Sequence, residues 1–317
     1  MSFFRTTDLG NFFRGLLMGS ADIIPGVSGG TMALILGIYE RLVTAISHID
    51  TQLLRYLRRR QFALMAQHVD LRFLITLGSG ILFGVVSLAT LMNHLLDYYP
   101  GPTLAVFFGL ILASSLLVAR MVNRWNTVNV VFAVAGMIFA YWLVAQPVMA
   151  GHDGYPYLFL CAMIAICAMI LPGISGAFIL LIMGKYTHVT GAISSLVHGD
   201  LSPEHFLTLT VFGAGCVVGI LSFSKILRWL LAHYHAATMA VLGGFMVGSL
   251  RRLWPFKDLQ AGEVIDFKHK QYHNVWPSQF DAQFWITVGL MVSATVLVLL
   301  LEWWAQRHHK LPASEDE

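Results

Sequence analysis

The chain has 317 residues, of which 12% are charged and 57% are hydrophobic, and its mean hydropathy is +0.69. Soluble domains carry roughly 25% charged residues, so this composition excludes an ordinary soluble enzyme, a disordered chain and a collagen-like fibre. The net charge of +3, with Lys and Arg placed between apolar runs, excludes a basic nucleic-acid binder. The apolar runs are continuous rather than alternating, which excludes a β-barrel. We therefore predict an all-α, polytopic integral membrane protein.

A helix that crosses the membrane needs about twenty mostly apolar residues. Two apolar stretches are interrupted, at Pro25-Gly26 and at Pro172-Gly173. Six others are uninterrupted, and the fifth of them is short. The uninterrupted stretches are Phe73–Met92, Thr103–Val122, Val128–Val148, Phe206–Leu230, Thr238–Leu250 and Phe284–Trp304.

The positions of Lys and Arg in the loops predict the orientation of the chain. The loop that contains Arg58, Arg59 and Arg60 is expected on the cytoplasmic side, as is the tail 307–317. Alternation then places the loop Arg251–Asp281 outside, although it contains five Lys and Arg residues. It is the one loop that disagrees with the rule. Its length and aromatic residues suggest that Trp254–Asp281 covers the outer mouth of the protein.

The chain contains an internal repeat. PGVSGGTMALILGIYERLVTAIS begins at Pro25, PGISGAFILLIMGKYTHVTGAIS begins at Pro172, and eleven of the twenty-three positions are identical. Downstream, Gly78-x-Gly80-x3-Gly84 matches Gly213-x-Gly215-x3-Gly219, which we interpret as small-residue helix contacts. We predict a first repeat over 1–149, a second over 150–306 and a cytoplasmic tail over 307–317.

Each repeat has one interrupted segment and three uninterrupted spans. In the first repeat, Gly15–Ile24 and Gly30–Tyr39 are ten residues each, about 15 Å at helical rise, which is half of a roughly 30 Å core. This predicts a re-entrant hairpin around 15–39, an odd number of crossings and an inverted second repeat. A single broken span would instead give parallel repeats. In the second repeat the broken segment covers about 155–194, and Tyr155–Leu171 is long enough that it could nearly cross.

The interrupted motif has residue types that suit an anion. Pro25 ends the first arm, Gly26 permits a tight turn, and Ser28 is placed to cap the second arm. Backbone amides at such a helix start bind phosphates and carboxylates. The candidate substrate-binding residues are Ser28, Gly29, Gly30 and Thr31, with Ser175, Gly176 and Ala177 after Pro172 and Gly173 in the second repeat. The alternative is a proline kink eased by small residues for packing.

Charged residues near the motifs are few. Asp22 is the only charge between Arg14 and Glu40, and a carboxylate inside a membrane is a functional candidate by default. It could accept a coupling proton or Na⁺ or orient Ser28, or it could simply lie at the interface. Glu40, Arg41 and Lys185 follow the second arms, where they could contact a headgroup or extend to water.

The two motifs together resemble a known family. GSADIIPGVSGGTMALILGIYERLV, paired with LPGISGAFILLIMGKY, is similar to the domain-of-unknown-function family 368, whose characterised members are polyprenyl-phosphate translocases of the PopT family. The resemblance runs from about Arg14 to Leu301. It implies transport of undecaprenyl phosphate, the carrier lipid of cell-wall peptidoglycan synthesis, across the bacterial inner membrane. It also marks as motif positions Asp22, Pro25, Gly26, Ser28, Gly29, Gly30, Glu40, Pro172, Gly173, Ser175 and Gly176.

Two other functions stay open at this point. One is a secondary transporter of a small soluble anion with Asp22 as the coupling site. The other is a membrane undecaprenyl pyrophosphatase, but in those enzymes an Arg follows the motif Ser, whereas Gly29 and Gly176 do so here, and no E-x3-E occurs. We therefore expect no enzyme activity, no catalytic residue, no cofactor and no metal. The expected ligands are the lipid and a coupling proton or Na⁺.

Overall fold

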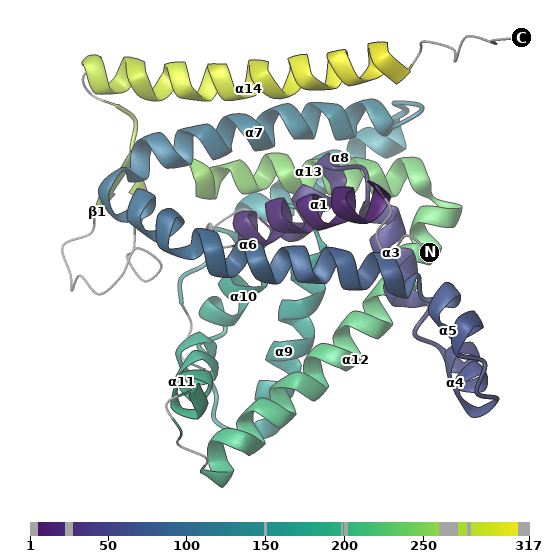
Figure 1. Ribbon diagram of the computed structural model, residues 1–317. Helices are drawn as coiled ribbons and strands as arrows, with labels where there is room; N and C mark the ends of the chain where they lie inside the picture. The colour runs from purple at the N-terminus through teal and green to yellow at the C-terminus, as the bar shows by residue number, and fades with distance from the viewer. Residues whose placement is uncertain are drawn as a thin grey trace, which may run out of the picture.

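The computed structural model describes residues 6–22, 28–148, 151–197, 199, 202–259, 272–277 and 280–309. Apart from one short antiparallel hairpin, the regular structure of this part is helical (Figure 1). The first half contains α1 (Thr6–Asp22), α2 (Gly29–Ile35), α3 (Tyr39–Ser47), α4 (Thr51–Arg58), α5 (Phe62–His68), α6 (Leu71–Tyr98), α7 (Pro100–Met121) and α8 (Thr127–Leu143). The second half contains α9 (Tyr155–Ile170), α10 (Gly176–Ile182), α11 (Tyr186–Val197), α12 (Pro203–His233), α13 (His235–Leu253), β1 (Lys257–Leu259), β2 (Tyr272–Asn274) and α14 (Ala282–His309).

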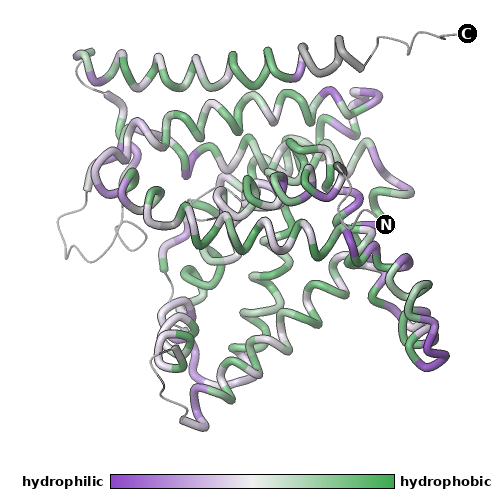
Figure 2. Tube along the Cα trace, in the orientation of Figure 1, coloured by the Kyte–Doolittle hydropathy of each residue, from purple (hydrophilic) through white to green (hydrophobic). Residues whose placement is uncertain are grey.

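Four helices of the described chain are long and apolar enough to cross a membrane, namely α6, α7, α12 and α14. This confirms the all-α membrane class and the four spans predicted within them. Figure 2 shows that these helices are mostly apolar along their length, whereas α4 and α5 mix apolar and polar residues. Only 11% of the apolar window of α14 is buried. Such a helix is stable when lipid is its solvent.

Two predicted spans differ in length from the structure. The span expected over Val128–Val148 ends at Leu143, so α8 has 17 residues. The span expected over Thr238–Leu250 is longer, because α13 has 19 residues and continues through Arg251 and Arg252.

The predicted small-residue contact holds α1 against α6. A methyl group at Gly80 would lie 2.1 Å from the carbonyl oxygen of Phe12, and one at Gly84 would lie 2.3 Å from that of Leu16. The residue number increases by four on both helices from one contact to the next, so the two helices are parallel. A methyl group at Gly78, in contrast, would meet no neighbouring atom within 4 Å, so the interpretation is confirmed for Gly80 and Gly84 and wrong for Gly78.

The same contact recurs between α9 and α12. A methyl group at Gly215 would lie 2.5 Å from the carbonyl oxygen of Phe159, and one at Gly219 would lie 2.7 Å from that of Met163. These four residues are the sequence equivalents of the α1–α6 set. A methyl group at Gly213, as at Gly78, would meet nothing within 4 Å. The repeat in the sequence is therefore a repeat of atomic contacts.

The equivalent helices α7 and α13 run in opposite directions (Figure 1). A methyl group at Gly101, near the start of α7, would lie 3.6 Å from the carbonyl oxygen of Pro255, which follows α13. Near the other end of α7, Val118 approaches Gly243. This antiparallel pair is what inverted repeats require. The boundaries 1–149 and 150–306 stay a prediction.

The first interrupted segment has a longer first arm than expected, whereas that of the second agrees with the expected Tyr155–Leu171 to within one residue. The ten-residue arm over Gly15–Ile24 is wrong, because α1 begins at Thr6 and has 17 residues, against 16 in α9. Either helix is about 25 Å long at 1.5 Å per residue. The helices after the interruption, α2 and α10, have seven residues each. Gly37 and Gly184 then turn the chain, both with φ of +67°, and α10 meets α11 at 114°.

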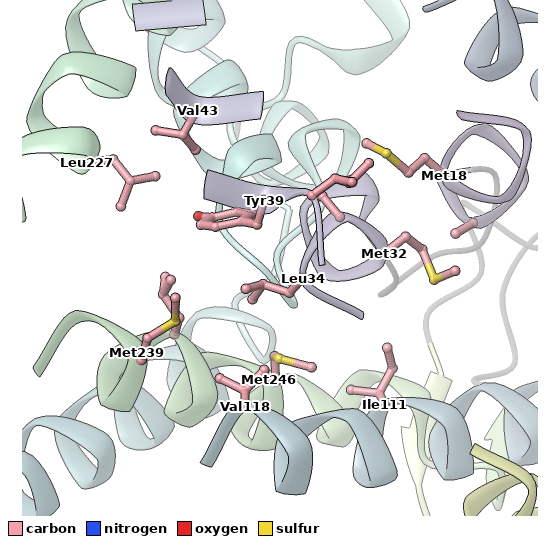
Figure 3. Packing of buried hydrophobic residues seen from close by; sticks show 14 of the residues in the cluster. Met18, Met32, Leu34, Tyr39, Val43, Ile111, Val118, Leu227, Met239 and Met246 are labelled. Atoms are coloured by element: carbon pink, nitrogen blue, oxygen red, sulfur yellow. The ribbon is translucent and has the colours of Figure 1, made fainter. Parts of the chain in front are cut away.

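The main core surrounds the first interrupted segment (Figure 3). Leu34 and Tyr39 lie in the same buried cluster as Ile111 of α7, Leu227 of α12 and Met239 of α13. Tyr39 is 2% exposed, and its hydroxyl is the one buried side-chain oxygen without a hydrogen-bond partner in the described part of the chain. Helices of both halves thus pack around the segment that follows the first motif.

The glycine contacts give a stability prediction. Replacing Gly80 with Leu forces side-chain atoms against the Phe12 carbonyl, so we expect the free energy of unfolding to fall by roughly 1–3 kcal/mol, as in other overpacked interfaces. Gly78→Leu is the matched control on the same helix, with an expected change within about 0.5 kcal/mol. Thermal unfolding of the detergent-solubilised variants measures both. Equal destabilisation would contradict the α1–α6 contact.

Candidate functional site

The two interrupted motifs meet in the interior of the protein. The backbone N–H of Gly173 donates to Thr31 Oγ1 at 2.7 Å, and Ser28 Oγ donates to the carbonyl oxygen of Leu171 at 3.1 Å. A methyl group at Gly30 would lie 2.3 Å from the carbonyl oxygen of Ile170. Ser28 and Thr31 are 1% and 0% exposed. The structure therefore brings together motif residues that are about 140 positions apart.

The start of α2 is partly occupied by the protein itself. Ser28 is the N-cap, and its Oγ accepts from the N–H of Thr31 at 3.3 Å. The N–H of Gly29 donates to Asp22 Oδ1 at 2.5 Å. Two of the four amides that we expected to face a ligand thus have acceptors within the protein. Asp22, the last residue of α1, supplies one of them.

The start of α10 is more open. Ser175 occupies the N-cap position, but its side chain makes no capping hydrogen bond. Ser175 is half-buried, Gly176 is buried and Ala177 is exposed. The position equivalent to Asp22 is Met169, which has no carboxylate with which to accept an amide.

The turn before α10 requires glycine. Gly173 has φ of +85°, a region that favours glycine. A methyl group there would also lie 2.7 Å from Ser249 Oγ and 2.9 Å from the carbonyl oxygen of Phe245. Pro172 is buried beside it. In the first motif, Pro25 and Gly26 lie outside the described residues.

Glu40 and Arg41 have polar partners away from the motif contacts. Glu40 Oε1 lies 2.9 Å from His235 Nε2, which joins α3 to the start of α13. Arg41 Nε donates to Asp70 at 2.7 Å, and its guanidinium lies 4.2 Å from the centroid of the Phe73 ring. The described contacts do not connect either side chain with Ser28.

Lys185 is buried rather than extended to water. The residue is 6% exposed, and its Nζ lies 3.5 Å from Asp153 Oδ1 and 5.8 Å from the centroid of the Tyr157 ring. The Tyr157 hydroxyl donates to the carbonyl oxygen of Met183 at 3.0 Å. No described contact connects Lys185 with Ser175.

A large groove, here called the His235 groove, reaches the place where the motifs meet. It has a volume of about 850 Å³ and is bounded by α8, α12 and α13. Its polar end contains Asn126, Asn129, His233 and His235. Apolar residues form the remaining walls, and they include Phe132, Leu171, Phe223, Leu227, Val241 and Phe245. Leu171 is the residue whose carbonyl accepts from Ser28, so the groove and the motif contact share it.

A second groove, here called the Arg251 groove, lies beside the other half of α13. It has a volume of about 710 Å³ and is bounded by α7, α8, α13 and the β2 region. Its wall includes Phe108, Tyr141, Val247, Arg251, Trp254 and Trp276. Sequence reasoning identified neither groove, because their walls come from separate helices. For the Arg251 groove, the sequence offered one indication: the Arg251–Asp281 loop carries more Lys and Arg than an outside loop is expected to have.

The cations of that loop are folded onto the protein. The guanidinium of Arg251 lies 4.3 Å from the Tyr141 ring centroid, and that of Arg252 lies 4.6 Å from the Phe178 ring centroid, on α10. Lys257 Nζ donates to the carbonyl oxygen of Arg252 at 2.6 Å. Burial and the nearby Arg252 lower the pKa of Lys257 to about 7.

The hydrogen bond between the motifs gives a second prediction. Thr31→Val keeps the side-chain shape but leaves the buried Gly173 amide without an acceptor, so we expect a loss of roughly 1–3 kcal/mol in the free energy of unfolding. Thr31→Ser keeps the acceptor and should recover most of the loss. Thr210→Val is the control, because this exposed hydroxyl bonds only within its own helix. If thermal unfolding shows that Thr31→Val destabilises the protein no more than Thr210→Val does, the hydrogen bond between Thr31 and Gly173 is contradicted.

Comparison with known proteins agrees with this architecture. The chain is 38% identical over 311 residues to a polyprenyl-phosphate transporter of Vibrio cholerae serotype O1, an alignment that covers 94% of this chain and 97% of that protein. It is 34% identical over 257 residues to a polyprenyl-phosphate transporter of Staphylococcus aureus, covering 77% and 86% respectively. No solved structure matches the chain. The family model described as VCA0040-like, undecaprenyl phosphate translocase-like, matches residues 18–272, and the chain therefore belongs to this family.

Proposed function

We propose that this protein moves polyprenyl phosphate, and specifically undecaprenyl phosphate, across the bacterial inner membrane without covalent chemistry. The family and the names of its relatives support a polyprenyl phosphate as the substrate. Return of this lipid would serve the recycling of the peptidoglycan carrier.

The observation that carries the proposal is the position of Leu171. Its carbonyl accepts from Ser28 where the two motifs meet, and the residue also lines the His235 groove. The substrate has one small, doubly charged headgroup and a long apolar chain. A polar motif contact at the end of an apolar groove suits both parts, because phosphate needs hydrogen-bond donors and the chain needs to avoid water.

The headgroup would be held mainly by backbone amides around the motif contact. Since α2 and α10 have only seven residues each, we assign the binding to N–H donors rather than to a helix dipole. The second motif is the more accessible, with Ser175, Gly176 and Ala177 as its donors. In the first, the amides of Gly29 and Thr31 are already bound by Asp22 and Ser28, and Gly30 follows between them.

Asp22 suits the role of coupling residue. A phosphate that approaches the Gly29 amide meets the Asp22 carboxylate, which already accepts that N–H. Two anions at one site repel each other. A proton or Na⁺ taken up at Asp22 would remove this repulsion, and so would couple the entry of the lipid to the cation.

The remaining charged candidates would act where the lipid enters. His235 lies at the polar end of the His235 groove and is hydrogen-bonded to Glu40, so a headgroup that enters there passes these two side chains. Arg41 is the next residue of α3. Lys185, paired with Asp153, would act in the second half.

A bulky residue in the His235 groove tests the proposal. In vesicles that contain the purified protein, Val241→Trp should lower the rate at which labelled undecaprenyl phosphate changes leaflets about tenfold or more, a change of about 1.4 kcal/mol in barrier height. The matched control is Val217→Trp, because Val217 is 55% exposed on α12 and outside the groove.

Three outcomes would contradict the proposal. One is equal transport by Val241→Trp and the wild-type protein. Another is competition by inorganic phosphate at millimolar concentration, which would favour a transporter of a small soluble anion. The third is release of inorganic phosphate from undecaprenyl pyrophosphate, which would show an enzyme.

A further inference from the structure

Arg251 places a positive charge at the wall of an apolar groove. It is the seventeenth residue of the 19-residue helix α13, and it is half-buried. The same groove is lined by the aromatic residues Phe108, Tyr141, Trp254 and Trp276. A cation beside aromatic and aliphatic walls is complementary to an anion that carries an apolar chain.

Most hydrogen-bond donors of Arg251 have no partner in the described part of the chain. A guanidinium has five N–H donors, and one hydrogen bond within the described chain uses them, from Nη1 to the carbonyl oxygen of Tyr141 at 3.3 Å. In the same described part no carboxylate lies within ion-pair distance of Arg251. A half-buried cation without a counter-charge is costly, and a bound phosphate would supply that charge with bidentate geometry.

The groove is held in place by the hairpin that follows α13. The rings of Trp254 and Trp276 stack with centroids 5.5 Å apart, and Trp254 Nε1 donates to the carbonyl oxygen of Val275 at 3.0 Å. Asn274 Nδ2 donates to the carbonyl oxygen of Arg251 at 2.7 Å. The aromatic wall is therefore tied to the backbone of the arginine itself.

The residue next to Arg251 is a second arginine. Lys257 Nζ donates to the carbonyl oxygen of Arg252, and the Arg252 guanidinium lies over the Phe178 ring on α10. Arg251 thus lines the groove, whereas Arg252 contacts α10, the helix that follows the second motif. The electrostatic field at the groove favours an anion.

We propose that the Arg251 groove is a second docking site for the lipid, with the phosphate monoester on Arg251 and the first isoprene units against Trp254 and Trp276. This inference rests on the proposed function. The His235 groove is lined by the first half of α13, as far as Phe245, and the Arg251 groove by the second half, from Val247. The lipid thus has one docking site near each end of the same helix.

The chemistry of the walls selects a lipid phosphate over other ligands. A soluble phosphate would gain nothing from the apolar walls, and a neutral polyprenol would gain nothing from Arg251. A diacyl phospholipid has a phosphodiester with one charge, whereas the monoester offers up to two and more acceptor oxygens to the guanidinium. The ligand that fits this groove is therefore a long-chain isoprenoid phosphate.

Photo-crosslinking can locate both docking sites separately. The probe is undecaprenyl phosphate with a diazirine on the isoprene unit nearest the phosphate, added to the full-length protein in vesicles. Mass spectrometry should find crosslinks in the Arg251 groove, at Trp254, Trp276 or Val247, and in the His235 groove, at Phe223 or Val241. Arg251→Gln should reduce the first set about tenfold, as expected for loss of a charge-assisted hydrogen bond, and leave the second set unchanged.

Two variants and two competing lipids make the result decisive. Arg251→Lys retains the charge and should restore most of the crosslinking, which excludes misfolding as the cause. Arg252→Gln removes an equal charge that faces Phe178 and should have less than half the effect. Equal labelling of the Arg251 groove by the polyprenol probe without phosphate, or loss of labelling with excess phosphatidylglycerol, would overturn the proposal.

The outcomes also separate this inference from the proposed function. Crosslinks in the His235 groove together with transport, but none in the Arg251 groove, would overturn the second docking site alone. Absence of crosslinks in both grooves and absence of transport would overturn both.

Discussion

The structure depends on how buried backbone groups are satisfied where the two helical segments are interrupted. In an apolar surrounding each free N–H or carbonyl costs several kcal/mol, so an interrupted helix needs partners from elsewhere. Here the partners come from the opposite half of the chain: Thr31 accepts from Gly173, and Ser28 donates to Leu171. The backbone of the second interruption is thus bound by side chains of the first motif, whereas the Gly29 and Thr31 amides of the first are bound by Asp22 and Ser28 of their own half. The two motifs therefore stabilise each other, and the same contact joins the repeats and forms the polar centre of the protein.

The repeats share a sequence motif but not its environment. Asp22 closes the start of α2 by accepting the Gly29 amide, whereas its equivalent, Met169, cannot accept a hydrogen bond from Gly176. Ser28 is buried and caps its helix, whereas Ser175 is half-buried and makes no cap. The replacement of Asp22 by Met169 thus removes a carboxylate acceptor: the Gly29 amide is bound by Asp22, whereas the Gly176 amide has no such carboxylate beside it. Under the proposed function, this asymmetry would give the two similar halves different affinities for the phosphate.

Sequence patterns predicted the features that depend on local composition. Apolar runs located α6, α7, α12 and α14. Glycine spacing identified contact positions on α6 and α12, but it did not identify α1 and α9 as the partner helices. Hydropathy failed where polar residues are paired within the fold. Asp8 and Arg72 form an ion pair between α1 and α6, so α1 extends to Thr6 despite its polar residues. Arg251 and Arg252 lie over aromatic rings, so α13 continues beyond Leu250. The grooves could not be predicted, because their walls are assembled from helices far apart in the sequence.

The close packing of α13 against α8 limits which helices could move to open or close the two grooves. A methyl group at Gly244 would lie 2.1 Å from the carbonyl oxygen of Ala133, and one at Gly248 would lie 2.3 Å from that of Met137. Contacts this close leave α8 and α13 little room to slide, so the pair acts as one rigid wall shared by both grooves. The opposite walls are different elements: α12 at the His235 groove, and the β2 region with Trp276 at the Arg251 groove. Under the proposed transport, opening one groove and closing the other would therefore fall to these outer walls, about the centre where the two motifs meet.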